Sequence, residues 1–160
     1  DVAVIPLPDF KQKMKQIGYL SATANLLGIT TPKIACIAPS EQVLPNVISS
    51  TEGALLAKMG DRGQLGNVII DGPLSLDVAL YKEVAEHKKV KGSSVAGDPD
   101  CLLFPNLESA NVFFKCASHL CGGELAAMVM GTKVPCVLTS RGDTSLTKLY
   151  SIALACLAAK

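Results

Sequence analysis

The run Ile34–Ala38 (IACIA) decides the fold class, because no polar residue interrupts it. A strand with one face in water alternates apolar and polar residues, whereas a continuous apolar run is typical of a strand buried on both faces. Similar runs, each bounded by Pro, Gly, Asp or Asn, are Val2–Ile5, Asn67–Ile70, Cys101–Phe104 and Val134–Thr139, with Ala126–Met130 as a further candidate. These runs predict the strands of one buried sheet.

Helical patterns lie between the predicted strands. Apolar residues three and four positions apart predict a long first helix through Phe10, Met14, Ile17, Ala24 and Leu27. Further helices are predicted at Thr51–Met59, Leu76–Val84, Ala110–Leu120 and Thr144–Ala159. Buried strands that alternate with helices are typical of a mostly parallel sheet with helices on both faces. We therefore predict a doubly wound α/β fold.

The composition narrows the classes of protein that fit this chain. It has 160 residues, 49% of them hydrophobic and 18% charged, with a net charge of +1. This is too apolar for intrinsic disorder, and the length suffices for a buried core. Nucleic-acid binding needs a surplus of clustered Lys and Arg, which a near-neutral chain lacks. The most apolar stretch, Ile152–Ala159, is far shorter than the roughly 20 residues of a membrane helix. We expect neither nucleic acid nor a membrane as partner.

The six cysteines point to a reducing compartment. None forms a CxxC pair, and most lie in apolar runs, so we expect reduced, core-packed thiols in a cytoplasmic protein. Cys116, His119 and Cys121 are near one another in sequence, but on a helix Cys116 and Cys121 would point in different directions, and no fourth ligand is evident. We therefore predict no metal site. The chain opens with Asp1 inside an apparent strand, without the pattern of a signal peptide, and we expect an upstream half to be missing.

Three polar, glycine-bearing or proline-bearing segments follow predicted strands. They are Asp71–Pro73, Pro105–Glu108 and Ser140–Asp143. Ligands of open α/β sheets bind beyond the carboxyl ends of the strands, which is where these segments would lie. Each segment taken alone is better explained by ordinary turn chemistry, since Gly-Pro and Pro-Asn are common strand-to-helix connectors.

Several ordered motifs together resemble one family. They are Asp71–Asp77 (DGPLSLD), Val95–Asp100 (VAGDPD), Phe104–Lys115 (FPNLESANVFFK), Val137–Asp143 (VLTSRGD) and the stretch Thr147–Ala155. This set resembles the phosphate acetyl/butyryltransferase family, and the closing stretch is most similar to its butyryltransferase branch. The first 60 residues match more loosely.

The resemblance implies a two-domain architecture. Family members have two α/β domains of the isocitrate/isopropylmalate dehydrogenase-like fold, with the active site in the cleft between them. By this resemblance residues 1–138 form the second domain, and residues 139–160 form the segment and helix that return to a first domain outside this chain. The implied reaction is reversible transfer of a short acyl group between coenzyme A and inorganic phosphate. No permanently bound cofactor is implied, and a homo-oligomer is expected.

The resemblance also implies catalytic residues near the last helix. Arg141 suits phosphate, because a guanidinium forms two parallel hydrogen bonds to an oxyanion. Ser140 matches the family's active-site serine, which hydrogen-bonds the developing charge. Asp143 is a candidate base toward the thiol, an orienting partner of Arg141, or an N-cap of the helix. The acetyltransferase branch has a catalytic Asp where this chain has Thr147. His119 is expected on a packed helix, so no histidine base is predicted.

Four further residues are candidate substrate ligands. Asn111 and Lys115 share one predicted helix face with Glu108, and this face is either a ligand surface or a solvated polar stripe. Asp71 is expected to order its loop, and Gly72 to let the backbone approach the ligand. The competing function is a noncatalytic α/β module that binds a ligand or partner and is inactive because the N-terminal half is missing.

Overall fold

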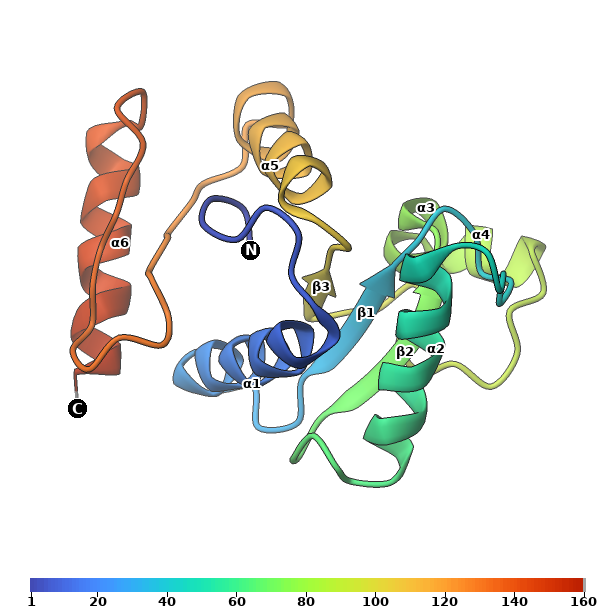
Figure 1. The fold of residues 1–160 in the computed structure, drawn as a ribbon. Helices are drawn as coiled ribbons and strands as arrows, with labels where there is room; N and C mark the ends of the chain where they lie inside the picture. Colours follow the sequence, from blue (N-terminus) through green and yellow to red (C-terminus); the bar gives the residue numbers. More distant parts are fainter. Residues whose placement is uncertain (160) are drawn as a thin grey trace. The chain divides into compact units, whose positions relative to one another are not determined.

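The computed structural model describes residues 1–159 of the chain (Figure 1). These residues form two compact units, one at Asp1–Asn111 and one that begins at Val112. No helix in the part of the chain that the structure describes is both long and apolar enough to cross a membrane.

The first unit contains a small parallel sheet. Its elements in chain order are α1 (Phe10–Leu26), β1 (Lys33–Ile37), α2 (Ile48–Asp61), β2 (Ile69–Leu74), α3 (Leu76–Leu80), α4 (Lys82–His87), β3 (Cys101–Leu103) and the start of α5 (Leu107–Lys115). Strand β1 is central, and the spatial order is β2-β1-β3. Both pairs are parallel, with Lys33 beside Ile69 in one and Ile34 beside Cys101 in the other. The predicted α/β class and parallel pairing are confirmed for these three strands.

Helices cover both faces of this sheet. On one face Ile34 and Cys36 of β1 pack with Ile17 of α1 and Leu56 of α2. On the other face Ala35 and Ile37 pack against residues of α3 and α4, among them Val78, Ala79 and Ala85. Because successive side chains of a strand point to opposite faces, the uninterrupted run in β1 supplies both cores.

The prediction of a strand at Val2–Ile5 is wrong. The backbone N–H groups of Ala3, Val4 and Ile5 donate to the Asp1 carboxylate at 2.8–2.9 Å. A short acidic side chain that accepts from the backbone nearby competes with sheet formation. This segment therefore folds as a local turn rather than joining the sheet.

The strands predicted at Val134–Thr139 and Ala126–Met130 are also absent. The two segments meet at one isolated antiparallel bridge, in which Val129 N–H donates to Cys136 at 2.8 Å. Pro135 interrupts the predicted run, and proline has no N–H for a ladder. The second unit thus contributes no strand within the described residues.

The predicted helices are present with changed limits. The one predicted at Leu76–Val84 is two helices, because Tyr81 is extended (φ −122°, ψ 115°). Its N–H ends α3 by donating to Asp77, and its carbonyl begins α4 by accepting from Val84 and Ala85. The second unit continues α5 into the π-helix η1 (Cys116–Leu120) and ends in α6 (Ser145–Ala158).

Candidate functional site

The carboxyl ends of three parallel strands form one edge of the first unit, whereas Asp71 and Gly72 lie inside β2, where Asp71 pairs with Ala35 of β1. The prediction that Asp71–Pro73 follows this strand is therefore wrong, because the strand continues to Leu74. Asp71 Oδ1 accepts from the N–H of Gly72 at 2.8 Å, so this carboxylate is held by the backbone of its own strand and orders no loop. A Cβ added to Gly72 would lie 2.6 Å from Cβ of Cys36. Glycine is therefore needed for β2 to approach β1. Ligand binding by Asp71 and Gly72 stays a prediction.

Asn111 and Lys115 lie on α5, at the end of the first unit and the start of the second. The Asn111 side-chain amide donates to the carbonyl of Val2 at 2.9 Å, which ties the N-terminal segment to this helix. The Lys115 ammonium lies 4.4 Å from the ring centroid of Phe114. Such a cation–π contact favours a cation over the ring face. The helix places both residues and Glu108 at the predicted spacing, and their role toward substrate stays a prediction.

A polar cluster that the sequence did not predict lies just beyond β1 and β2. The Lys88 ammonium is 3.0 Å from a carboxylate oxygen of Asp77 and 3.7 Å from one of Glu41. Ser75 Oγ accepts from the Lys88 ammonium at 3.3 Å and lies 3.1 Å from a carboxylate oxygen of Glu41. These residues join the loop after β1 to α3 and to the end of α4.

This cluster makes acid stability depend on Asp77. The Ser75 hydroxyl and the Lys88 ammonium hold the Asp77 pKa at about 2, below its ordinary 3.8. A depressed folded-state pKa stabilises the protein above pH 4, and this contribution is lost as the pH falls toward 2. Asp77→Asn should therefore weaken the protein at neutral pH and flatten the loss of stability between pH 4 and 2. Urea unfolding across this pH range measures both, and parallel curves for the two proteins would contradict it.

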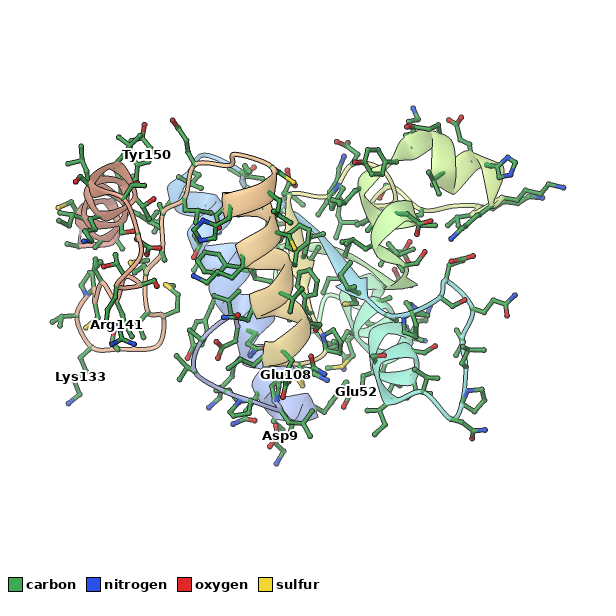
Figure 2. All side chains as sticks on the ribbon, turned by 90° about the horizontal axis from the view of Figure 1, so that it is seen from above. Asp9, Glu52, Glu108, Lys133, Arg141 and Tyr150 are labelled. Carbon is green, nitrogen blue, oxygen red and sulfur yellow. The ribbon has the colours of Figure 1, made fainter. Side chains whose placement is uncertain are left out.

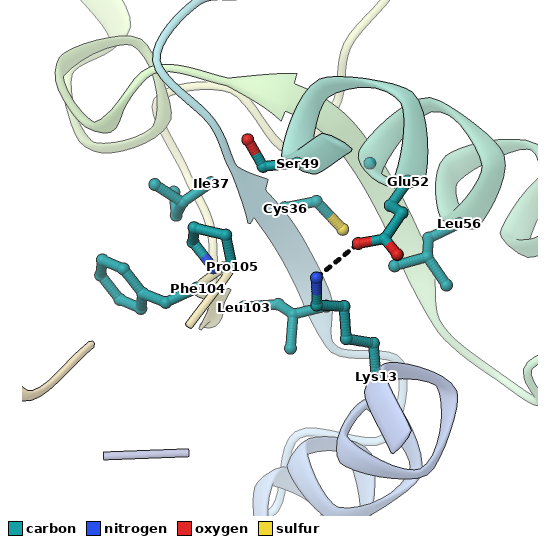
Figure 3. Close-up of a pocket in the computed structure, with 10 residues that line it drawn as sticks. Lys13, Cys36, Ile37, Ser49, Glu52, Leu56, Leu103, Phe104 and Pro105 are labelled. Carbon is teal, nitrogen blue, oxygen red and sulfur yellow. Dashed lines mark hydrogen bonds and ion pairs between the residues drawn. The ribbon is translucent and has the colours of Figure 1, made fainter. Parts of the chain in front are cut away.

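A buried ion pair lies at the same edge of the first unit, between α1 and α2. Lys13 is only 4% exposed, and its ammonium donates to Glu52 (Figure 3). The two side chains lie at a narrow pocket at the ends of β1 and β3, which Cys36, Phe104 and Pro105 also line. Burial, assisted by the Asp71 charge, raises the pKa of the Cys36 thiol to about 12. This thiol is therefore not a nucleophile at neutral pH.

In the second unit, Ser140, Arg141 and Asp143 share one turn before α6. The N–H of Ser140 donates to Asp143 Oδ2 at 2.7 Å, and the N–H of Asp143 donates back to the Ser140 carbonyl at 3.1 Å. Arg141 is exposed and, among residues 1–159, forms no salt bridge (Figure 2). No surface carboxylate among these residues therefore pairs with Arg141.

Thr144, not Asp143, is the N-cap of α6. Its hydroxyl oxygen accepts from the N–H of Thr147 at 3.1 Å. The N-cap alternative for Asp143 is therefore wrong, because that carboxylate accepts from Ser140 instead.

Thr144→Ala removes this cap and should lower the free energy of unfolding by about 1 kcal/mol. Thr144→Ser keeps the oxygen acceptor and should retain most of the stability. Urea unfolding of both variants tests the assignment, and equal losses would contradict it.

A pocket of about 280 Å³ lies within the second unit, between η1, the turn after it and the start of α6. Its lining includes Asp143 and Thr147 together with His119, Glu124 and Tyr150. His119 is exposed at this pocket, so its expected packing on a helix is wrong. Sequence reasoning missed Glu124 and Tyr150, which no motif distinguishes.

The positions of the cysteines differ from the sequence prediction. All six thiols are free, but only Cys36 is buried, so the expectation of mostly core-packed cysteines is wrong. Cys116 and Cys121 begin and follow η1, and Cys121 is exposed. Within the described part of the chain, no three His, Cys, Asp or Glu residues gather in a metal-binding arrangement.

Comparison with known proteins identifies relatives of this chain. Residues 1–156 match the sequence profile of the family described as "Phosphate acetyl/butaryl transferase". The chain is 45% identical over 159 residues to a phosphate butyryltransferase of Clostridium beijerinckii, covering 99% of this chain and 52% of that protein. It is 40% identical over 154 residues to a phosphate acetyltransferase of Thermotoga maritima, covering 96% of this chain and 52% of that protein.

The fold agrees with these relatives. The crystal structure of a branched-chain phosphotransacylase from Enterococcus faecalis superposes with a TM-score of 0.88 at 29% identity, over 98% of this chain and 56% of that one. The chain thus spans about half the length of the curated relatives it matches. A profile match over nearly every residue, agreeing with relatives in both sequence and fold, means that the chain belongs to the phosphate acetyl/butaryl transferase family.

Proposed function

We propose that this protein catalyses reversible transfer of a short acyl group between coenzyme A and inorganic phosphate. The observation that carries the proposal is the 45% identity, over 99% of the chain, to a phosphate butyryltransferase. In the forward direction a phosphate oxygen forms a bond to the acyl carbon and the carbon–sulfur bond breaks. The proton of HPO₄²⁻ ends on the departing sulfur, so an acyl phosphate and a free thiol result.

The turn before α6 supplies the groups that this chemistry needs. Arg141, exposed and unpaired within residues 1–159, binds the phosphate oxygens through its two parallel N–H donors. The Ser140 hydroxyl donates to the oxyanion that develops on the acyl carbonyl. Asp143, which Ser140 N–H holds in place at the rim of the 280 Å³ pocket, accepts the proton or orients Arg141.

The remaining sequence predictions belong to the same proposal. Asp71, Gly72, Asn111 and Lys115 contribute to substrate binding, and coenzyme A thioester and phosphate are substrates rather than resident cofactors. Residues 1–138 form the second domain of an isocitrate/isopropylmalate dehydrogenase-like fold, and residues 139–160 return to a first domain. The protein works in the cytoplasm as a homo-oligomer.

Thiol release tests this function. The native protein is incubated with butyryl-CoA or acetyl-CoA, and the free thiol is followed with a colorimetric reagent as phosphate is raised. We expect release that requires phosphate and saturates with it. Release that is independent of phosphate indicates a thioesterase, and no release from either thioester favours the noncatalytic module.

A further inference from the structure

The pocket at Lys13 lies where α/β sheets bind ligands. Strand β1 is central, and the chain leaves it through α2 to β2 and then returns past β1 to β3. The crevice between β1 and β3 is thus the point at which the connections diverge, and ligands collect at this point beyond the carboxyl ends of the strands. The pocket is lined by Cys36 and Ile37 at the end of β1 and by Leu103 to Pro105 at the end of β3.

Lys13 brings unused hydrogen-bond donors to this crevice. Its side chain is 6% exposed, and an ammonium has three N–H donors. Among the described residues its hydrogen bond is to Glu52 alone, which leaves two donors for the pocket. Figure 3 shows the ammonium reaching from α1 toward Glu52 of α2 across the end of β1. Donors that are removed from water without acceptors cost free energy, so an oxygen atom in the pocket would be bound favourably.

The size of the pocket limits what it holds. Its free volume is about 10 Å³, which is that of one water-sized atom. One oxygen of a larger group fits into this volume, with the rest of the group outside it. The Glu52 carboxylate offsets the charge of the ammonium, so the pocket suits a single oxygen acceptor and does not require a full negative charge on that oxygen.

We propose that Lys13 donates a hydrogen bond to one oxygen atom of the bound substrate in this pocket. The shared chemistry is a partly negative oxygen, which belongs either to phosphate or to the thioester carbonyl. This inference rests on the proposed transfer of an acyl group from coenzyme A to phosphate. It adds a binding residue from α1, a helix in which no predicted site residue lies.

A double variant tests the proposal in the native protein. Lys13→Met/Glu52→Gln removes both charges while keeping the side-chain volumes, which avoids leaving one buried charge unpaired. Wild-type turnover is established first, so failure of the transfer reaction itself is recognised separately. We expect the KM for phosphate or the KM for butyryl-CoA to rise at least tenfold, and the substrate affected identifies the oxygen.

The matched control removes another ion pair of the first unit. Lys33→Met/Asp98→Asn deletes an exposed pair at the amino end of β1, away from the crevice. It should leave both KM values unchanged. If the Lys13/Glu52 variant shows unchanged KM values for both substrates, the pair is only structural and the proposal is overturned.

If the double variant does not fold, a measurement on the unmutated protein tests the proposal instead. With ¹⁵N-labelled lysine, the side-chain Nζ resonance of Lys13 is assigned by its absence in Lys13→Arg. Saturating phosphate or butyryl-CoA should shift this resonance if the ammonium contacts a substrate oxygen. No shift with either substrate, in a protein that turns both over, overturns the proposal.

Discussion

Arg141→Ala is expected to raise the KM for phosphate by about 100-fold while the KM for butyryl-CoA changes little. A guanidinium bound to a phosphate by two charge-assisted hydrogen bonds contributes roughly 1.5–3 kcal/mol for each of them, and the loss falls on the substrate that it holds. Arg141 is exposed in the turn before α6 and forms no salt bridge within residues 1–159, so its removal breaks no ion pair there. Initial rates over a matrix of both substrates measure the effect.

Two further variants separate the effect of the bidentate hydrogen bonds of Arg141 from the effect of its positive charge. Arg141→Lys keeps the positive charge but loses the bidentate geometry, so we expect it to recover only part of the phosphate affinity. Lys133→Ala removes one positive charge from an exposed position of the same unit and should change neither KM (Figure 2). A phosphate KM in Arg141→Ala equal to that of Lys133→Ala would remove Arg141 from the phosphate site.

Gly97→Ala adds a single methyl group and is expected to cause a large loss of stability. Gly97 has φ +81°, and a Cβ added there would lie 2.4 Å from Cα of Lys82, a backbone atom. The left-handed conformation costs a non-glycine residue about 1–2 kcal/mol, and overpacking adds about 1–3 kcal/mol. We therefore expect the free energy of unfolding to fall by about 2–5 kcal/mol, measured by urea denaturation.

Gly18→Ala provides the matched control for the same chemical change. Gly18 lies inside α1, and a Cβ there meets no atom within 4 Å. Alanine should stabilise this helix by about 0.5–1 kcal/mol relative to glycine. If Gly97→Ala raises the free energy of unfolding as Gly18→Ala does, the close approach of Gly97 to α4 is contradicted.

Hydrophobic patterning predicted the sheet of the first unit because its strands are buried on both faces. The continuous run in β1 and the runs that became β2 and β3 need no alternation, and the predicted limits of β1 and β3 are within one residue of those observed. The limits of β2 were predicted wrongly, because Asp71, Gly72 and Pro73 continue the strand to Leu74 instead of ending it. The same patterning failed at Val2–Ile5, where the run is equally apolar but the Asp1 carboxylate takes its N–H groups. A count of apolar residues does not detect a side chain that competes for backbone N–H donors.

Motifs predicted the turn residues of the proposed site but not the residues that tertiary packing brings together. Ser140, Arg141 and Asp143 are adjacent in sequence, so one motif contains all three, whereas Lys13 and Glu52 are 39 residues apart. Their pairing depends on α1 and α2 lying beside the same strand. A usable signal existed, since Lys13 is four residues before the buried Ile17 and so lies on the buried face of α1. A lysine there needs a partner or a ligand.

The most direct test of the account is the stoichiometry of products formed by the native protein from butyryl-CoA and phosphate. Free thiol is measured by its reaction with a disulfide reagent, and acyl phosphate by conversion to the hydroxamate. We expect butyryl phosphate and coenzyme A in a one-to-one ratio, at a rate that depends on phosphate. Butyrate in place of butyryl phosphate, with thiol released at the same rate without phosphate, would contradict acyl transfer to phosphate as the function of this chain.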